Sequence, residues 1–355
     1  MILLILLLGL GGCASPRGRE TACVVCSGPS PAVGTLVDAP VRDTFRLRIL
    51  SLNVWGLPEW MNGAHPERYA RIRAGIEESQ ADVVVLQEVW TLRAHEAVPM
   101  TAGWSSAAAH DQDRFVRRNG LVTASRLRIL GAEFHPFTSS RIPDAFVRKG
   151  ALKVTLELRG GMLANLWNVH LQAGGASGTR LAQIDELSRW VRDARDGQAI
   201  DIVAGDFNSP LGSPGFQKLL DVIGPTTQQI AGEPYFVTYD ACRPGASRGE
   251  TLDYVFVRLR SPLARLGAHT EDAFAAPSSL ERCSDHIGLA ASIDGSGLSV
   301  AGGVSADVRA VLAYQRGGGP APVSNARTRT GIAPIGAPGS FWGKGVLEDP
   351  PLAGP

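Results

Sequence analysis

The sequence predicts an α/β fold in which β-sheets pack face to face and helices cover their outer sides. Two observations carry this prediction: short apolar strands recur along the chain, and a few amphipathic helices interrupt them. The chain has 355 residues, of which 44% are hydrophobic and 19% charged, an ordinary globular composition. Length alone does not decide between one large domain and two small ones.

The first half of the domain begins with a strand and a helix. From Phe45 to Leu52, apolar and polar residues alternate with the period of two of a half-buried strand. His65-Pro66 then begins a helix, because proline suits the first helical position. One face of that helix carries Tyr69, Ile72 and Ile76. Val83 to Leu86 is a continuous apolar run, typical of a strand buried on both faces.

A hairpin opens the second half. Leu152 to Leu158 alternates with polar residues, and Leu163 to Val169 forms the return strand. Gly160-Gly161 between them supplies the positive φ values of a tight turn. An amphipathic helix then carries Leu181, Ile184, Leu187 and Val191 on one face. The remaining predicted elements are a strand at Ile200–Ala204, a short helix capped by Ser213-Pro214, and closing strands at Leu252–Val257 and Ile287–Ile293.

The N-terminus predicts export. Ile2 to Leu10 is an apolar run too short to cross a bilayer but of the length of a signal-peptide core. Gly11-Gly12-Cys13 follows and resembles the bacterial lipobox, so residues 1–13 are the expected signal and Cys13 the expected lipidation site. No Lys or Arg precedes the run, which leaves an upstream start or a buried hydrophobic end as alternatives. Residues 14–43, rich in small and polar residues, are predicted to be a tether.

Export sets the expected location and the state of the thiols. We expect a protein of the bacterial cell envelope, lipid-anchored at the outer membrane or the periplasmic face, or secreted. In an oxidising compartment Cys242 and Cys283 are a candidate disulfide, and two unpaired thiols are the alternative. Residues 296–355, beyond the predicted domain at 44–295, are dominated by Gly, Pro, Ala and Ser and predict a disordered tail. A net charge of +1 gives no basic excess for nonspecific binding of nucleic acid.

Polar side chains recur where these strands begin or end. They are Asn53, Glu88, His170, Asp206, Asn208, Asp253, Asp285 and His286. Each alone is an ordinary turn or cap residue, but coincidence would have to act at every strand end. If those ends lie on one side of the packed sheets, the side chains converge in a single cleft. Carboxylate and amide oxygens suit Mg²⁺, and no zinc-type cluster or G-x-x-x-x-G-K-S/T loop is present.

Several segments together resemble the endonuclease/exonuclease/phosphatase superfamily. In chain order they are Leu50–Pro58, Leu86–Trp90, Asn119–Leu121, Asn168–Leu171, Gly205–Asn208, Leu252–Tyr254 and Ser284–His286. The resemblance covers residues 45–293 and implies a DNase-I-like four-layer sandwich, with two packed mixed β-sheets flanked by helices. Within the superfamily the chain is most similar to neutral sphingomyelinases, through Leu47–Leu57, the helix that contains Arg68 and Arg71, and Arg148-Lys149-Gly150.

The resemblance implies a phosphoric diester hydrolase that uses one or two Mg²⁺ ions, for which Mn²⁺ can substitute. The residues at the metal would be Glu88, Asn53 and Asp285. His286 would be the general base that activates water for in-line attack, oriented by Asp253. His170 would donate a hydrogen bond to the transition state or assist the leaving group.

The remaining site residues implied by the resemblance bind substrate. Asp206 and Asn208 would position the water and the phosphate. Lys149 is a candidate phosphate contact, and a solvated surface charge is the alternative. The expected substrate is a membrane phospholipid of the sphingomyelin type, met by Trp55 and Trp60 beside Asn53 and by a second apolar loop at 142–146. The alternative is that these aromatic residues pack as core beneath the site.

Two rival functions remain open at this point. An extracellular nuclease on the same scaffold would need a basic groove for phosphates. The arginines that could supply it are Arg114, Arg117, Arg118, Arg126 and Arg128. The second rival is a non-catalytic surface lipoprotein, against which the complete set of polar residues argues. In each case we expect a monomer.

Overall fold

The structure is a computed structural model. It describes residues 20–26, 44–62, 67–99, 101–109, 119–142, 144, 147–158, 163–194, 200–227, 229, 237–239, 249–259, 265–271 and 284–296. The predicted lipidation site Cys13, the candidate disulfide Cys242–Cys283 and the predicted tail beyond Ser296 lie outside these residues. None of the described helices is long and apolar enough to cross a bilayer.

The fold is built mainly from strands. They are β1 (Glu20–Cys26), β2 (Thr44–Asn53), β3 (Val83–Gln87), β4 (Ser105–Ala109), β5 (Val122–Ser125), β6 (Arg128–Pro136), β7 (Gly150–Glu157), β8 (Leu163–His170), β9 (Ile200–Asp206), β10 (Asp253–Leu259), β11 (Arg265–Glu271) and β12 (Gly288–Ser296). The helices are α1 (Glu59–Asn62), α2 (Arg68–Glu78), the 3₁₀ turn η2 (Ala94–Ala97), α3 (Ser177–Asp193) and α4 (Pro214–Val222).

The strands are hydrogen-bonded in the order β10-β9-β8-β7-β6-β1-β4-β5-β3-β2-β12-β11. Strand β1 pairs with β6 on one side and β4 on the other, and so joins two sheets that pack face to face. Both sheets are mixed, since β2 is parallel to β3 and β8 is parallel to β9 while the other pairs are antiparallel. The predicted arrangement of two packed mixed sheets is confirmed.

Strand β1 corrects the prediction that residues 14–43 are only a tether. Glu20–Cys26 lies inside that range and forms a ladder with β4. Its run of Ala, Cys and Val is too short for a periodic signal, but β-branched valines favour a strand once a partner edge is available. Strands β4 and β5 were also missed, because small residues such as alanine and serine give no alternating hydrophobic pattern.

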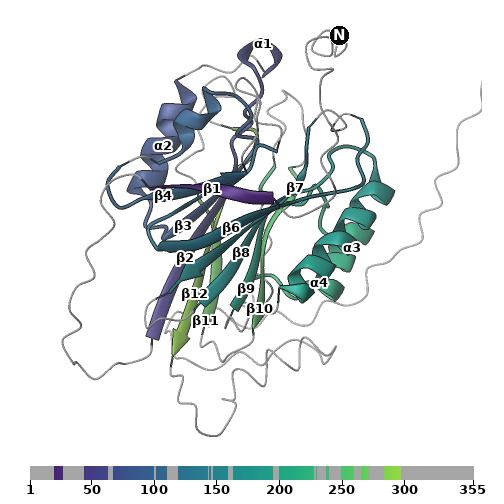
Figure 1. Cartoon of the computed structure of the whole chain (residues 1–355). Helices are drawn as coiled ribbons and strands as arrows, with labels where there is room; N and C mark the ends of the chain where they lie inside the picture. Colours follow the sequence, from purple (N-terminus) through teal and green to yellow (C-terminus); the bar gives the residue numbers. More distant parts are fainter. Residues whose placement is uncertain are drawn as a thin grey trace, which may run out of the picture. The chain divides into compact units, whose positions relative to one another are not determined.

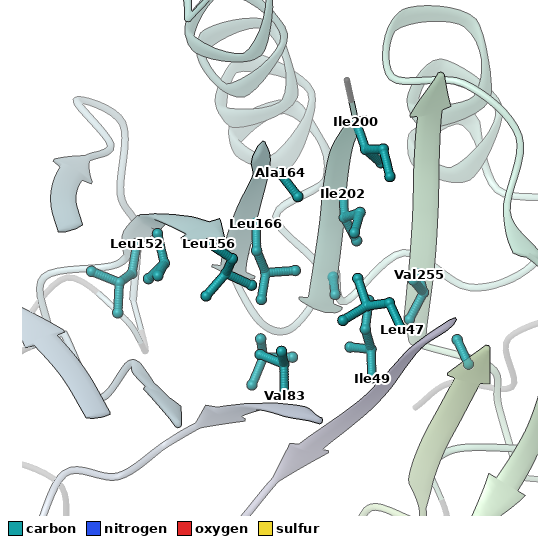
Figure 2. Close-up of a cluster of buried hydrophobic side chains, with 14 of the residues drawn as sticks. Leu47, Ile49, Val83, Leu152, Leu156, Ala164, Leu166, Ile200, Ile202 and Val255 are labelled. Atoms are coloured by element: carbon teal, nitrogen blue, oxygen red, sulfur yellow. The ribbon is translucent and has the colours of Figure 1, made fainter. Parts of the chain in front are cut away.

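The core between the sheets consists of inward-facing side chains from both. Figure 2 shows Leu47, Ile49 and Val83 of one sheet opposite residues such as Leu152, Leu166 and Ile202 of the other. Strands β3 and β9 are buried along their whole length, as the continuous apolar runs predict. Burying apolar surface at about 25 cal/mol per Å² makes this interior the main source of stability for the scaffold.

Helices cover the outer face of each sheet (Figure 1). The predicted stripe Tyr69, Ile72 and Ile76 on α2 packs against the outer face of β2 and β3. On the other side α3 and α4 pack side by side over β8, β9 and β10. The predicted cap of α4 is present, since the Ser213 side chain accepts a hydrogen bond from the Phe216 N–H at 3.2 Å. The four layers α/β/β/α follow from these contacts.

Strand register brings the predicted polar residues to one end of the sandwich. Asn53 is paired with Gln87 at the ends of the parallel strands β2 and β3. At the ends of β8 and β9, His170 is paired with Asp206, and Asp253 at the start of β10 faces Asp206 from the other side. Asp285 and His286 directly precede β12, and they lie at the same end of the sandwich because Leu289 of β12 pairs with Ser51 near the end of β2.

Candidate active site

Asp206, at the end of β9, lies at the centre of the polar cluster. Its Oδ2 accepts a hydrogen bond from Asn53 Nδ2 at 3.0 Å and lies 3.4 Å from His170 Nε2 and 3.7 Å from His286 Nε2. Its Oδ1 accepts a hydrogen bond from the Asn208 N–H at 2.9 Å. The predicted convergence of these side chains in one place is therefore what the structure shows.

Asn53 links Asp206 to Glu88. The Asn53 amide also donates to Glu88 Oε1 at 3.0 Å, while its Oδ1 accepts from the Trp55 N–H at 2.9 Å. Trp55, Glu88 and Asn208 have φ values of 51°, 60° and 47°, and they are the non-glycine residues with positive φ in the described part of the chain. Strained backbone that gathers in one place is typical of functional sites, where surrounding contacts must enforce the conformation.

His286 is paired with Asp253. The ring Nδ1 lies 2.8 Å from Asp253 Oδ2, which leaves Nε2 facing Asp206. Burial lowers the pKa of His286, but the charges of Asp253 and Asp206 outweigh it and raise its pKa well above the usual value. Burial raises the pKa of Asp253 to about 6. The nearby carboxylates therefore favour the protonated form of the His286 ring.

His170 has the opposite environment. Its Nε2 lies 2.8 Å from Lys149 Nζ, and burial together with the Lys149 charge holds its pKa well below the usual value. Lys149 also donates to the Leu171 carbonyl at 2.7 Å and lies 2.8 Å from Asp144 Oδ2. These three acceptors use all three ammonium hydrogens.

This geometry shows how His170 and Lys149 are held in the protein without substrate. Because the ammonium donates to Nε2, His170 is the acceptor of that hydrogen bond, and its own proton lies on Nδ1, which has no partner among the described residues. Lys149 is buried and fully bonded within the protein, so it is neither a solvated charge nor, in this arrangement, a free phosphate ligand.

The surroundings of Glu88 and Asp285 disfavour the ionised form of both carboxyl groups. Burial, and then the neighbouring charge of Asp285, raise the pKa of Glu88 to about 7. Burial likewise raises the pKa of Asp285, and Asp206 adds to the effect. A bound cation would remove this repulsion, so the site fits a hard dication such as Mg²⁺. Within the described ranges no three His, Cys, Asp or Glu side chains form a metal-ligand group by themselves, and Mg²⁺ commonly keeps several waters.

The predicted substrate-contacting tryptophans differ in exposure. Trp60 on α1 is 67% exposed, which removes the alternative that it packs as core. Trp55 is only partly exposed and lies against the Arg68 guanidinium, whose Cζ is 5.6 Å from the ring centroid. Trp90, two residues after Glu88, stacks on His170 with the ring centroids 6.1 Å apart.

Sequence reasoning did not assign four of the residues that lie at the site: Trp90, Arg68, Ser284 and Tyr239. Ser284 Oγ donates to the Asn53 carbonyl at 2.5 Å and accepts from the His286 N–H at 3.1 Å. Tyr239 places its ring 5.0 Å from that of His286. Arg68 and Ser284 lie in segments that carried the family resemblance, whereas Tyr239 lies in a stretch with no periodic signal.

Comparisons with known proteins identify the family of this chain. Residues 50–286 match the description "Endonuclease/Exonuclease/phosphatase family". The chain belongs to this family. An inositol phosphosphingolipids phospholipase C of Schizosaccharomyces pombe is 28% identical over 181 residues, which are 47% of this chain and 42% of that protein. Human sphingomyelin phosphodiesterase 2 is 25% identical over 177 residues, 46% of this chain and 41% of that protein. The chain thus spans less than half the length of these relatives.

The fold is also found in solved structures. A mutant beta toxin of Staphylococcus aureus with bound magnesium ions superposes with a TM-score of 0.51 at 18% sequence identity, covering 69% of this chain and 98% of that one. This likeness confirms the predicted sandwich fold. At this identity it shows the fold and nothing finer.

Proposed function

We propose that this protein is a Mg²⁺-dependent phosphodiester hydrolase that acts on a membrane phospholipid of the sphingomyelin type. The observation that carries the proposal is the His286–Asp253 pair, whose free ring nitrogen faces Asp206 beside the Asn53–Glu88 pair. A protein that only binds a partner has no need of this arrangement. Family membership supports hydrolysis of a phosphate ester, and the names of both relatives support a sphingolipid.

Glu88, with Asn53 and Asp285 beside it, would hold the metal. When bound, the ion would supply a positive charge that polarises the phosphate and opposes protonation of the nearby His286. His286 would take the proton of the attacking water at Nε2, while Asp253 would hold the ring and stabilise the imidazolium that forms. Asp206 and Asn208 would position the phosphate and the water. Lys149 keeps His170 neutral and fixes the direction of its ring.

Exposed apolar side chains near the site support a lipid substrate. Trp60 on α1, Leu92 after β3 and Ile142 between β6 and β7 are 67%, 66% and 72% exposed. All three lie on segments next to the strand ends that carry the polar cluster. Tryptophan and aliphatic side chains at such a rim enter the interfacial region of a bilayer, where a phospholipid head group is held.

The nuclease alternative is less well supported. Arg128, at the start of β6, pairs with Glu157 at 3.3 Å, at the end of the β6–β7 ladder remote from Gly150 and the site. Arg126 donates to the Glu77 carbonyl and lies over Trp104. Neither side chain lies along the site, and Arg114, Arg117 and Arg118 lie outside the described residues.

A substrate panel tests the proposal. The purified protein with Mg²⁺ is assayed on sphingomyelin vesicles and on plasmid DNA, with and without a chelator. We expect phosphocholine release that the chelator abolishes, and no cutting of DNA. DNA cutting without lipid hydrolysis would establish the nuclease instead, and activity on neither substrate would overturn hydrolysis altogether.

A matched pair of variants tests the membrane rim. Trp60→Ala should lower hydrolysis on vesicles by about tenfold and leave hydrolysis of a soluble phosphodiester unchanged, because the indole contributes interfacial binding only. Leu130→Ala is the control, since Leu130 is 44% exposed near the opposite end of β6. Equal activity of both variants on vesicles would remove the rim from the proposal.

A further inference from the structure

A buried arginine behind the active site makes contacts that the proposed reaction does not yet use. Arg68, at the start of α2, is 1% exposed. Its Nη1 donates to the Val54 carbonyl at 2.7 Å, and its Nη2 donates to the Trp55 carbonyl at 2.5 Å. One guanidinium therefore holds two consecutive carbonyl groups, which a planar fork of donors does well and a lysine ammonium on a flexible stem does poorly.

The segment held by Arg68 is strained. Trp55 has a φ of 51°, a left-handed conformation that side chains other than glycine rarely adopt. In this conformation the Trp55 N–H donates to Asn53 Oδ1 at 2.9 Å. Holding the Asn53 oxygen leaves its Nδ2 directed at Glu88 Oε1 and Asp206 Oδ2. The conformation of Trp55 thus sets the direction of the Asn53 amide.

Arg68 also reaches the segment that carries Glu88. Its Nη2 donates to the Tyr69 hydroxyl at 2.6 Å, and that hydroxyl shares a hydrogen bond with the Thr91 side chain. Thr91 lies three residues after Glu88, which itself has a φ of 60°. Arg68 therefore contacts the strained Val54–Trp55 segment directly and is linked to the chain after Glu88 through the Tyr69 hydroxyl.

We propose that Arg68 is a positioning residue of the active site, which holds the strained Val54–Trp55 segment so that the Asn53 amide stays between Glu88 and Asp206. A residue with only a structural role would stabilise the fold without affecting the geometry of reacting groups. Arg68 instead acts through two hydrogen bonds on a side chain that touches both carboxylates. The proposal rests on the proposed hydrolysis for its kinetic effect, and on the proposed Mg²⁺ site for its effect on ion binding.

The test compares Arg68→Lys with Arg71→Lys. Arg71 is exposed on the same helix, so the control makes the same chemical change away from the site. Arg68→Lys should lower kcat on sphingomyelin vesicles by about 30-fold and change KM by less than about twofold, because misplaced reacting groups lower the rate without removing substrate contacts. Mg²⁺ binding, measured by calorimetry without substrate, should weaken by about tenfold. Arg71→Lys should behave as wild type in both measurements.

Folded fraction is measured by circular dichroism, and rates are normalised to it. A second variant, Tyr69→Phe, removes only the hydroxyl that joins Arg68 to Thr91, and should lower kcat by about fivefold at unchanged KM. If Arg68→Lys does not fold, the kcat and the Mg²⁺ affinity of Tyr69→Phe test the positioning role instead. Normalised kcat and Mg²⁺ affinity equal to those of Arg71→Lys would overturn the positioning role. A wild-type protein that hydrolyses no substrate would overturn the proposed function, while the Mg²⁺ titrations would still test Arg68.

Discussion

His286 and His170 both lie close to Asp206 Oδ2, but the charged side chain nearest to each ring differs in sign. His286 faces the Asp253 carboxylate at 2.8 Å, whereas His170 faces the Lys149 ammonium at the same distance of 2.8 Å. Both rings are buried, and burial lowers the pKa of each. The carboxylates nevertheless raise the pKa of His286 well above its usual value, while Lys149 lowers that of His170 further.

The difference teaches that residue type alone does not assign a role within this site. His286 is a ring that can exchange a proton, because its pKa depends on the balance between nearby carboxylates and any bound cation. Burial and Lys149 hold the pKa of His170 well below its usual value, which favours the neutral ring, and its Nε2 accepts a hydrogen bond from Lys149. Each of the following predictions changes one side of this comparison.

The largest expected effect is the loss of the ring that exchanges the proton. His286→Ala should lower kcat on sphingomyelin vesicles by about 10⁴-fold, and His170→Ala by only about 10²-fold, because only the first removes general base catalysis. Steady-state kinetics of both variants, with folding checked by circular dichroism, measures the gap. Equal losses would mean that the two rings share one role.

The next effect comes from the carboxylate that orients His286. Asp253→Asn should lower kcat by about 10³-fold, because the amide no longer stabilises the imidazolium or fixes the tautomer. Asp253 raises the pKa of His286, so its loss lowers that pKa, and the rising limb of the kcat–pH profile should move to lower pH. A limb that stays in place, or moves to higher pH, would contradict the pairing.

Sequence reasoning identified both histidines, but it predicted the charged partner of only one of them, the Asp253 carboxylate beside His286. The strand ends gave the location of Asp206, Asp253 and His170, because each of these side chains begins or ends an apolar strand that the sequence predicts. The pairing of Lys149 with His170 was not predictable, since Lys149 lies in a loop whose path depends on tertiary contacts. Strand β1 was missed for a similar reason, since its partner edges exist only after folding.

The third prediction concerns the stability of the protein when Glu88, which lies beside His170, is replaced. Glu88 Oε1 lies 3.9 Å from His170 Nε2, and a neutral imidazole does not compensate a buried carboxylate. The pKa of Glu88 is raised from 4.5 to about 7, so folding favours the protonated carboxyl. The free energy of unfolding of the wild type therefore falls as pH rises from 4.5 to about 7. In the presence of a chelator, Glu88→Gln should therefore be more stable than wild type above pH 7 by about 3 kcal/mol.

Urea unfolding at a series of pH values measures this difference. The difference in unfolding free energy should shrink toward zero as pH falls below 4.5, where Glu88 becomes protonated in both the folded and the unfolded protein. Glu96→Gln, on the exposed side of η2, should show no such trend. A Glu88→Gln variant that is less stable than wild type at every pH would show that the carboxylate is compensated by other contacts.

The smallest expected effect reverses the environment of His170. Lys149→Met removes the charge that lowers the pKa of His170, so the ring should titrate at a higher pH than in wild type, although burial still opposes protonation. The titration is followed by NMR of labelled histidine, with the His170 signal assigned from His170→Gln. We expect kcat to fall by about tenfold, because the ring loses its fixed partner.

The double variant Lys149→Met with Asp144→Asn controls for the buried Asp144 carboxylate left without its cation. If His170 titrates as in wild type in both variants, Lys149 does not set its protonation state, and the contrast between the two histidines rests on burial alone.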